Sequence, residues 1–366
     1  MRIAYVLTSL GMGGAERQVA TLAERMAARG HAVSLLVLRA RQSEEWPTTV
    51  DLVRLDMRRT AVSLFAGLWR ARRSLRVFAP DLIHSHTFHA NISARLLRLL
   101  HPAPVLSTIH NVYEGSWPRM LAYRLTDPLS LRTIAVSQAA ASRYLRLKAV
   151  QDHKCSVINN GIDTQMFQPS PERRARLRAE MGAQGESIWL AAGRIAPAKD
   201  YPNLLRAFAQ VQAGLPTARL WIAGEATGPE AASVQSLIAE LRLGASVRLL
   251  GLRRDMPALF DAADGFVLAS AWEGMPLAVG EAMAMEKPVV VTDVGGVREL
   301  VGECGVIVQA KTPETLAQAM LALMETTPEA RGSLGRAARE RIQRAFSMDA
   351  KAREWEALYR TILQPG

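Results

Sequence analysis

The chain has 366 residues, of which 49% are hydrophobic, 22% charged and 6% aromatic. This composition is typical of a globular protein and excludes a disordered or fibrous one, and the length suits two domains of about 150–180 residues each. No apolar run reaches the ~18 residues of a transmembrane helix. The two cysteines, Cys155 and Cys304, lie far apart, which excludes a disulfide framework and a cysteine-based zinc site and indicates a reducing compartment.

Positive charge is concentrated in the first half of the chain. Residues 1–165 contain 22 Lys and Arg against 11 Asp and Glu, a net charge of +11, whereas residues 166–366 contain 23 of each kind and are neutral. This asymmetry favours an anionic partner for the first half. Nucleic acid is disfavoured because no known binding motif for it is present.

Apolar runs that predict strands alternate in the first half with amphipathic stretches that predict helices. The run Arg2–Leu10 predicts a strand and not a signal peptide, because a glycine turn and a charged stretch follow it without a small-residue cleavage site. The elements expected after it are helix Ala15–Arg29, strand Ala32–Leu38, helix Ser63–Phe78 and strands Asp81–His84, Val105–His110 and Thr133–Val136.

The second half repeats this rhythm after a boundary between residues 159 and 185, which turn residues and a Pro-rich connector mark. Aliphatic strands separated by helices predict parallel sheets covered on both faces. We therefore expect two α/β units, with ligands at the carboxyl ends of the strands. The elements expected are helix Pro202–Ala213 and strands Ser187–Ala192, Ala218–Ala223, Val247–Leu250, Gly265–Leu268, Pro288–Thr292 and Gly305–Val308.

A glycine-rich turn, Gly11 to Glu16, joins the first strand to the first helix. Glycines at this place allow a ligand to approach the backbone, and the helix N-terminus offers N–H groups to an anion. The dinucleotide motif would have glycine where Glu16 stands and an acid where Arg39 stands. The turn therefore predicts either a phosphate site or a tight packing turn.

Two cations, Arg194 and Lys199, follow the first strand of the second half. An arginine fork and a lysine at the carboxyl end of a strand can hold a diphosphate. Two solvated surface charges are the alternative.

Two carboxylates eight residues apart, Glu273 and Glu281, flank a Gly/Pro loop and the start of an apolar helix. Burying Glu281 among apolar residues is costly unless it accepts good hydrogen bonds, which a ribose diol can donate. The loop and the helix N-terminus can face a phosphate or a sugar. A surface loop followed by an ordinary helix is the alternative.

Histidines cluster at His84, His86 and His89, and His110 ends a predicted strand. Strand alternation places His84 and His86 on one side, but no acidic or cysteine ligand is near, so a zinc site is disfavoured. His110 on its own is a hydrogen-bonded loop residue.

An arginine-rich amphipathic stretch lies in the first half. Arginine with tryptophan on one helix is typical of helices that bind anionic bilayers, whereas a helix docked on its sheet with a solvated basic face is the alternative. The residues concerned are Arg54, Arg58, Arg59, Arg70, Arg72, Arg73 and Arg76, with Leu64, Phe65, Leu68 and Trp69.

The order and spacing of these motifs together resemble those of retaining glycosyltransferase family 4. The resemblance extends along almost the whole chain. The segments Val157–Asp163 and Val291–Glu299 also fit, and Tyr113–Asp127 is similar to bacterial polysaccharide and lipopolysaccharide enzymes. The resemblance implies a GT-B fold, in which two Rossmann-like domains face each other across a cleft. The N-terminal, acceptor-binding domain would comprise residues 1–165 with a C-terminal helix, residues 348–366, that crosses back to it. The nucleotide-sugar-binding domain would comprise residues 166–347.

The resemblance also implies roles for the site residues. Arg194 and Lys199 would hold the donor diphosphate and stabilise the departing charge, Glu281 would hold the ribose, His110 would touch the sugar and Arg253 would hold the base. The implied catalytic residues are His110, Glu273, Arg194 and Lys199, and the implied donor-binding residues are Gly13, Gly14, Arg194, Lys199, Arg253, Glu273, Gly274, Met275, Pro276, Leu277 and Glu281.

The implied function is the retaining transfer of a hexose or N-acetylhexosamine from a nucleotide-sugar to a saccharide or lipid-linked acceptor in bacterial cell-surface polysaccharide assembly. The similarity of Tyr113–Asp127 to polysaccharide enzymes favours a UDP-sugar as the donor. We expect no metal or cofactor, because Arg194 and Lys199 replace a cation. We expect a cytoplasmic enzyme whose basic domain contacts the anionic inner face of the cell membrane. Two alternatives stay open. One is a non-catalytic sugar- or nucleotide-binding protein on the same fold, and the other is a nicotinamide-dependent oxidoreductase, which Glu16 and Arg39 disfavour.

Overall fold

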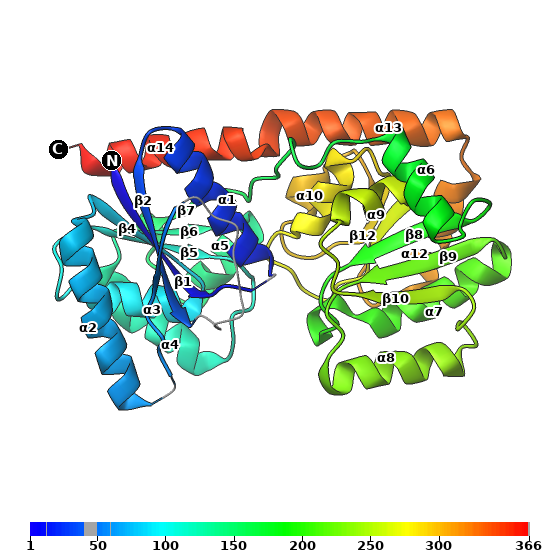
Figure 1. Ribbon diagram of the computed structural model, residues 1–366. Helices are drawn as coiled ribbons and strands as arrows, with labels where there is room; N and C mark the ends of the chain where they lie inside the picture. The colour runs from blue at the N-terminus through cyan, green and yellow to red at the C-terminus, as the bar shows by residue number, and fades with distance from the viewer. Residues whose placement is uncertain (12, 40–49, 59, 365–366) are drawn as a thin grey trace. The chain divides into compact units, whose positions relative to one another are not determined.

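The computed structural model describes residues 1–11, 13–39, 50–58 and 60–364. The chain divides into two compact units: unit 1 comprises Met1–Gly161 and Met348–Gly366, and unit 2 comprises Ile162–Ser347. The division falls four residues before the expected boundary at residue 165. Each unit is built on one parallel sheet with helices on both faces (Figure 1). The predicted α/β class with two Rossmann-like units is confirmed.

The sheet of unit 1 has seven strands among the described residues, in the order β3-β2-β1-β4-β5-β6-β7, and every pair is parallel. The edge strands β3 and β7 were not predicted, because they are short and only partly buried and so lack a clear apolar run. The strands are β1 (Arg2–Ser9), β2 (Ala32–Arg39), β3 (Asp51–Arg54), β4 (Leu82–His86), β5 (Val105–Ile109), β6 (Arg132–Ala135) and β7 (Cys155–Val157).

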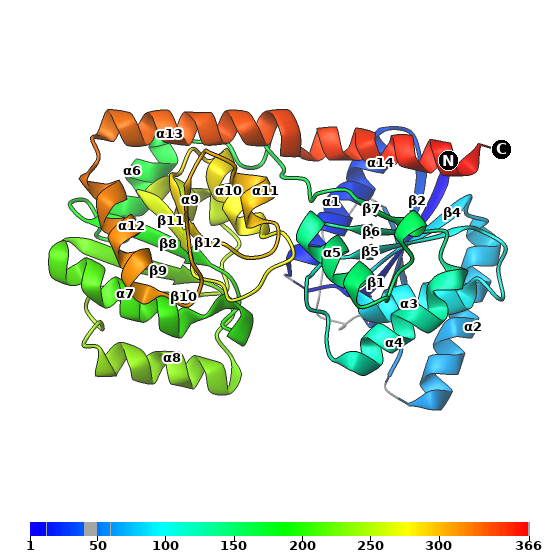
Figure 2. The same ribbon diagram turned by 180° about the vertical axis from the view of Figure 1, so that it is seen from behind.

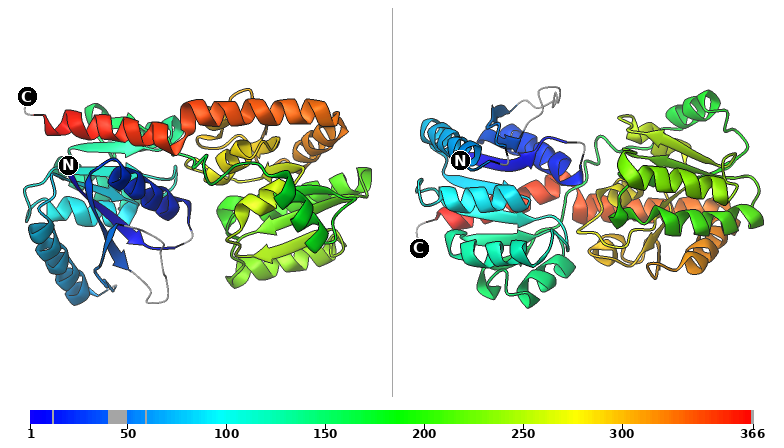
Figure 3. Two further views of the ribbon diagram at one scale, coloured as in Figure 1. Left: turned by 45° about the horizontal axis from the view of Figure 1, so that its top comes forward. Right: turned by 90° about the horizontal axis from the view of Figure 1, so that it is seen from below.

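Helices cover both faces of this sheet. They are α1 (Gly14–Ala28), α2 (Ala61–Phe78), α3 (Phe88–Leu97), α4 (Trp117–Thr126), α5 (Gln138–Arg146) and α14 (Met348–Leu363), with short 3-10 helices η1 (Asp127–Leu129) and η2 (Asp152–Lys154). Alternate residues of β1 point to opposite faces. Tyr5 packs with α1 and α14, and Val6 packs with α2 and α3. Figure 3 (left) shows α14 and α2 on opposite sides of the sheet. The predicted return of the C-terminal helix to the first domain is confirmed.

The sheet of unit 2 has six strands among the described residues, in the order β10-β9-β8-β11-β12-β13, again all parallel. Each strand lies within one residue of its predicted bounds. The strands are β8 (Ser187–Ala192), β9 (Ala218–Ala223), β10 (Val247–Gly251), β11 (Gly265–Leu268), β12 (Val289–Thr292) and β13 (Val306–Val308).

The helices of unit 2 also lie on both faces (Figure 2). Side chains of α7, α8 and α12 form one core with β8 and β9, while α9 and α10 contact β8, β11 and β12. The helices are α6 (Pro171–Glu180), α7 (Tyr201–Gly214), α8 (Gly228–Glu240), α9 (Met256–Ala262), α10 (Leu277–Ala284), α11 (Val297–Val301), α12 (Pro313–Glu325) and α13 (Pro328–Arg341), with the 3-10 turn η3 (Pro197–Lys199) and the π-helical turn η4 (Ile342–Phe346).

The strand order of each sheet reverses at one place. In unit 1 the reversal lies between β1 and β4, and in unit 2 between β8 and β11. At such a reversal the connections leave in opposite directions and open a crevice at the carboxyl ends of the strands, where α/β proteins bind ligands. No helix among the described residues has the length and apolar character needed to span a bilayer.

Candidate functional site

Two candidate residues meet where the strand order of unit 2 reverses, between β8 and β11. Lys199 lies in the loop after β8 and Glu273 in the loop after β11, and Lys199 Nζ donates a hydrogen bond of 2.6 Å to Glu273 Oε1. Ser270 Oγ donates to the same oxygen at 2.7 Å. The Glu273 side chain is buried, and a buried carboxylate needs such charge-assisted partners. The fold thus joins two predicted catalytic residues that are 74 positions apart in the sequence.

Glycines fix the loops around this pair. Gly295 has a φ of +55°, and a Cβ there would lie 2.1 Å from the carbonyl oxygen of Glu273. The N–H of Gly296 donates to the carbonyl of Gly274 at 2.8 Å. Only glycine combines this backbone conformation with so close an approach. The contact therefore fixes the loop that carries Glu273 against the segment that contains Gly295 and Gly296.

The turn after β8 is packed in the same way. A Cβ on Gly224, at the end of β9, would lie 2.0 Å from the carbonyl oxygen of Gly193. The Tyr201 hydroxyl donates to that same oxygen at 2.6 Å. These contacts hold the start of the segment that carries Lys199.

Helix α10 begins at Leu277, directly after the buried residues Gly274, Met275 and Pro276. No side chain of the described residues caps its N-terminus, which can therefore accept an anion. Glu281 lies in the second turn and is buried, as the sequence predicts. It makes polar interactions within the protein.

The two arginines of the predicted donor site do not join the pair of Lys199 and Glu273. Arg194 is exposed just after β8 and has no hydrogen bond to another described residue. Arg253, after β10, forms two hydrogen bonds of 2.8 and 2.6 Å with the carboxylate of Asp255. A ligand that used Arg253 would have to displace or share this partner.

In unit 1, the side chain of Glu16 folds back into the glycine-rich turn that Glu16 ends. Its carboxylate accepts a hydrogen bond of 3.1 Å from Ser9 Oγ, and its Oε2 lies 2.3 Å from where a Cβ on Gly13 would be. Gly13 precedes α1, and Gly14 begins it. Glycine at position 13 therefore makes room for the Glu16 side chain, which stands where the dinucleotide motif would have a third glycine.

Thr87, directly after β4, has an unusual backbone conformation that the sequence analysis did not predict. It has a φ of +70°, which is rare for a β-branched side chain and marks a strained backbone. Its hydroxyl lies 2.6 Å from that of Thr8, at the point where β1 and β4 are neighbours. Sequence offers no signal for such a conformation, because the tertiary contact imposes it.

The histidines of unit 1 form a hydrogen-bonded cluster. His84 contacts the Tyr359 hydroxyl at 2.6 Å and Thr108 Oγ1 at 2.7 Å, and His86 Nδ1 lies 3.0 Å from His110 Nε2. The rings of His84 and His86 lie 4.0 Å apart, so the predicted alternation is confirmed. No group of three or more His, Cys, Asp or Glu that could hold a metal occurs in the described part of the chain.

Burial sets the protonation of this cluster. It lowers the pKa of His84 and His86 far below the ordinary histidine value and lowers the pKa of His110 to about 4. All three rings are therefore neutral at pH 7, and each has one donor and one acceptor nitrogen. His110 can exchange hydrogen bonds with a ligand without bringing a positive charge.

Most of the amphipathic stretch forms α2, and this helix docks on its sheet, which is one of the two alternatives expected of it. Ala71 and Leu75 dock the helix on its sheet. The outward side nevertheless exposes large apolar residues, with Val62 82%, Phe65 73% and Trp69 56% exposed. Arg59, one of the arginines of this stretch, lies outside the described residues.

Comparison with known proteins gives consistent matches along the chain. A sequence model described as Glycosyltransferase Family 4 matches residues 12–166, and one described as Glycosyl transferases group 1 matches residues 186–326. The D-inositol 3-phosphate glycosyltransferase of Segniliparus rotundus is 31% identical over 321 residues, which is 82% of this chain and 70% of that protein. The lipopolysaccharide core biosynthesis mannosyltransferase LpsB of Rhizobium meliloti is 28% identical over 307 residues, 81% of this chain and 80% of that protein.

A solved structure shares the fold. Anabaena HepE, in complex with UDP and glucose, superimposes with a TM-score of 0.88 at 21% identity, covering 99% of this chain and all of that one. Both units therefore have the arrangement of strands and helices of a GT-B protein.

Proposed function

This chain belongs to glycosyltransferase family 4 and has the GT-B fold, and we propose that it transfers a hexose or N-acetylhexosamine, with retention of configuration, from a UDP-sugar to a saccharide or lipid-linked acceptor. The observation that carries the proposal is the pair of Lys199 and Glu273 at the β8–β11 crevice, close in sequence to the N-terminus of α10. A cation and a helix N-terminus suit the diphosphate of a nucleotide-sugar, and a carboxylate can accept hydrogen bonds from its hydroxyls.

Most of the groups proposed to bind the donor belong to unit 2. Lys199 and the exposed Arg194 hold the diphosphate and neutralise the charge that develops as the nucleotide departs. The N–H groups at the start of α10 add to this, and Glu281 accepts hydrogen bonds from the ribose hydroxyls. Arg253 contacts the base. UDP is favoured because HepE, which has this fold, was crystallised with UDP.

Transfer takes place on one face of the sugar. The bond between the anomeric carbon and the phosphate oxygen breaks, a bond from the acceptor hydroxyl oxygen to that carbon forms, and the hydroxyl proton passes to the departing phosphate. Glu273 and His110 orient the sugar, and the phosphate-facing glycines are Gly13 and Gly14. No metal is required, because the two cations supply the positive charge.

The acceptor is placed at a membrane. The excess charge of +11 in residues 1–165 and the exposed Phe65 and Trp69 on α2 suit the anionic inner face of a bacterial cell membrane, where lipid-linked saccharides are extended. In this proposal the enzyme works in the cytoplasm and contributes to cell-surface polysaccharide.

Thermal denaturation with UDP, GDP, ADP or NADH, each in EDTA, tests the donor site. A ligand of the native state raises its stability by about 2.7 kcal/mol at a hundredfold excess over Kd. We expect a shift with UDP that EDTA does not abolish and that Glu281→Gln removes, while Glu240→Gln on the surface of α8 keeps it. A shift with NADH alone would overturn the proposal in favour of an oxidoreductase.

A transfer assay then separates an enzyme from a binding protein. Membranes supply the acceptor, and a radiolabelled UDP-sugar supplies the donor. A non-catalytic role would be favoured if the protein binds UDP but neither transfers sugar from any UDP-sugar nor slowly hydrolyses one.

A further inference from the structure

A carboxylate that the proposed mechanism does not use, Glu114, lies four residues after His110. Its side chain turns back on the loop, so that Oε1 accepts the backbone N–H of His110 at 3.1 Å. Its other oxygen, Oε2, accepts the Tyr123 hydroxyl at 2.7 Å. Both oxygens of the carboxylate are thus engaged, one with the peptide of a candidate catalytic residue and the other with α4.

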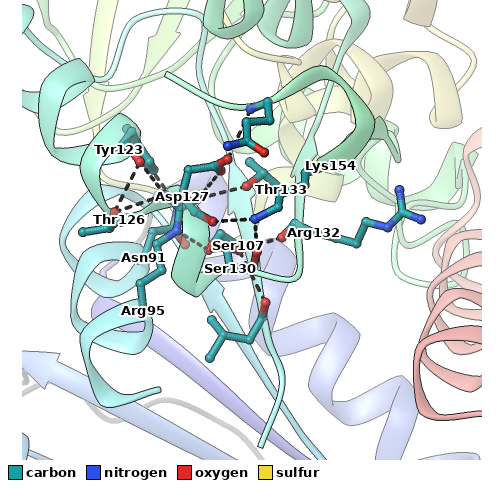
Figure 4. A network of polar contacts seen from close by, with 12 residues as sticks. Asn91, Arg95, Ser107, Tyr123, Thr126, Asp127, Ser130, Arg132, Thr133 and Lys154 are labelled. Carbon is teal, nitrogen blue, oxygen red and sulfur yellow. Dashed lines mark hydrogen bonds and ion pairs between the residues drawn. The ribbon is translucent and has the colours of Figure 1, made fainter. Parts of the chain in front are cut away.

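Tyr123 is itself held in place. It is fully buried, and its hydroxyl accepts a hydrogen bond of 2.9 Å from Asn91 Nδ2. Its carbonyl accepts one of 3.0 Å from the buried Arg95, which also donates to Ser107 and Thr133 on neighbouring strands. Figure 4 shows this network of polar side chains around Arg95 and Asp127. Moving Tyr123 would leave several buried polar groups unpaired, so Glu114 has a rigid anchor.

The loop between His110 and Tyr123 is shaped around Glu114. Gly115 has a φ of +121°, which turns the chain, and Arg119 donates to the carbonyl of Glu114 at 2.6 Å. The Glu114 backbone is therefore also held, by the Arg119 hydrogen bond to its carbonyl.

The ring of His110 is held from another side. Its Nε2 lies 3.0 Å from Nδ1 of the buried His86. Nε2 of His86 has no hydrogen-bond partner among the described residues. The bond to His110 is thus the one polar contact that the described structure gives the His86 ring, and Glu114 and His86 together fix the peptide and the ring of His110.

From this geometry we infer that Glu114 is a positioning residue, which acts through His110 by fixing its peptide at the end of β5. The inference rests on the proposed function, in which His110 contacts the donor sugar. Misplacement of a catalytic group by about 1 Å can lower a rate about a hundredfold. Apart from Gly13 and Gly14, the residues proposed to bind the nucleotide lie in unit 2, so the loss of Glu114 should lower kcat and leave UDP affinity unchanged.

The ionised form of Glu114 is the one that accepts both hydrogen bonds. Burial raises the pKa of Glu114, opposed by the hydrogen bonds from Tyr123 and from the His110 N–H and by the charge of Arg119. Tyr144 also faces this carboxyl. Protonation of the Glu114 carboxylate removes one of its two acceptor oxygens. As the pH decreases, we therefore expect kcat to begin to fall at a higher pH than it would if Glu114 had the pKa of an ordinary glutamate.

The test compares Glu114→Ala and Glu114→Gln with Glu354→Gln, the same chemical change on α14, where Glu354 pairs with Lys351. We expect kcat to fall about a hundredfold in Glu114→Ala and about tenfold in Glu114→Gln, which keeps an acceptor for the N–H, with UDP Kd within twofold. In Glu114→Gln the acidic decline of kcat should move to lower pH. Glu354→Gln should behave as the parent protein.

Hydrogen exchange at the His110 amide gives a readout that does not depend on activity. It should accelerate at least tenfold in Glu114→Ala and partly recover in Glu114→Gln, and Tyr123→Phe should accelerate it as well. If kcat and His110 exchange both stay within twofold of the parent in Glu114→Ala while UDP still binds, the inference is wrong. If the parent protein does not bind UDP, the proposed function fails, whereas the exchange data still decide whether Glu114 holds His110.

Discussion

Lys199 Nζ and Glu273 Oε1 lie 2.6 Å apart although they belong to loops that follow different strands. The contact exists because β8 and β11 are neighbours at the point where the strand order of unit 2 reverses. An ammonium in this place is already neutralised by a carboxylate, so an incoming diphosphate must share the lysine with Glu273. The pair is therefore the first place to test the proposed chemistry.

Lys199→Met should reduce transfer at least a hundredfold, because it removes a positive charge from the departing diphosphate. It should also lower the free energy of unfolding by about 2 kcal/mol, since Glu273 stays buried with Ser270 as the side-chain donor that remains to it among the described residues. Urea denaturation of Lys199→Met, Glu273→Gln and the double variant measures the coupling between the two side chains. The exposed Lys311→Met is the control, and a Lys199→Met enzyme with half of the parent activity would contradict the assignment.

Gly295→Ala should destabilise the protein by more than about 2 kcal/mol and weaken UDP binding. The new Cβ would be strained by the φ of +55° and would collide with the Glu273 carbonyl 2.1 Å away. Gly182→Ala is the matched control, because Gly182 has a φ of +63° but nothing within 4 Å of the added Cβ, so it should cost only about 1 kcal/mol. Equal losses of stability in the two variants would show that backbone strain alone is responsible and that the contact with the Glu273 carbonyl has no effect.

Stability should decrease as the pH falls from about 6.5 toward 4. The unfolded chain protonates its histidines near pH 6.5, whereas burial holds the pKa of His110 at about 4 and those of His84 and His86 well below 6.5. The unfolded state therefore binds more protons in this window, and each such histidine contributes a slope of about 1.4 kcal/mol per pH unit.

Denaturant titrations of His110→Asn across this range should give a slope smaller by one such contribution. The parent protein, titrated over the same pH range, gives the reference slope. An unaltered slope in His110→Asn would mean that His110 is protonated in the folded protein.

Membrane contact should depend on both the apolar and the basic residues of α2. Phe65→Ser with Trp69→Ser should weaken flotation with anionic liposomes at every salt concentration, because exposed apolar area is lost. Arg73→Glu with Arg76→Glu should weaken it most at low salt, where charges are least screened. Arg336→Glu with Arg344→Glu, two exposed arginines of unit 2, is the control, and equal flotation of all variants would exclude α2 as the contact.

Much of the fold could be predicted from sequence because parallel strands buried on both faces leave continuous aliphatic runs. The six strands of unit 2 fall within one residue of their predicted bounds for this reason. The edge strands β3 and β7 were missed because an edge is half exposed and carries polar residues. The buried position of Glu281 was also readable, since a carboxylate in an apolar helix predicts it.

The site residues themselves were identifiable as candidates, but their partners were not. Arg253 and Asp255 are two residues apart, yet nothing in their spacing predicts that the guanidinium and the carboxylate form an ion pair with two hydrogen bonds. Glu114 gave no signal of its own within the segment Tyr113–Asp127, because its importance comes from the fold of a loop back onto His110 and from a tyrosine on α4.

The sequence by itself determined the α/β class, the two-unit organisation, the family and the segments from which a donor site would be built, because these depend on local periodicity and on motifs that are contiguous in the chain. The tertiary structure alone decided which strands are neighbours, and thereby that Lys199 meets Glu273, that Thr87 is strained against Thr8 and that Glu114 holds the peptide of His110. Strand order is set by the packing of the whole sheet, and such contacts between distant residues cannot be read from any single segment.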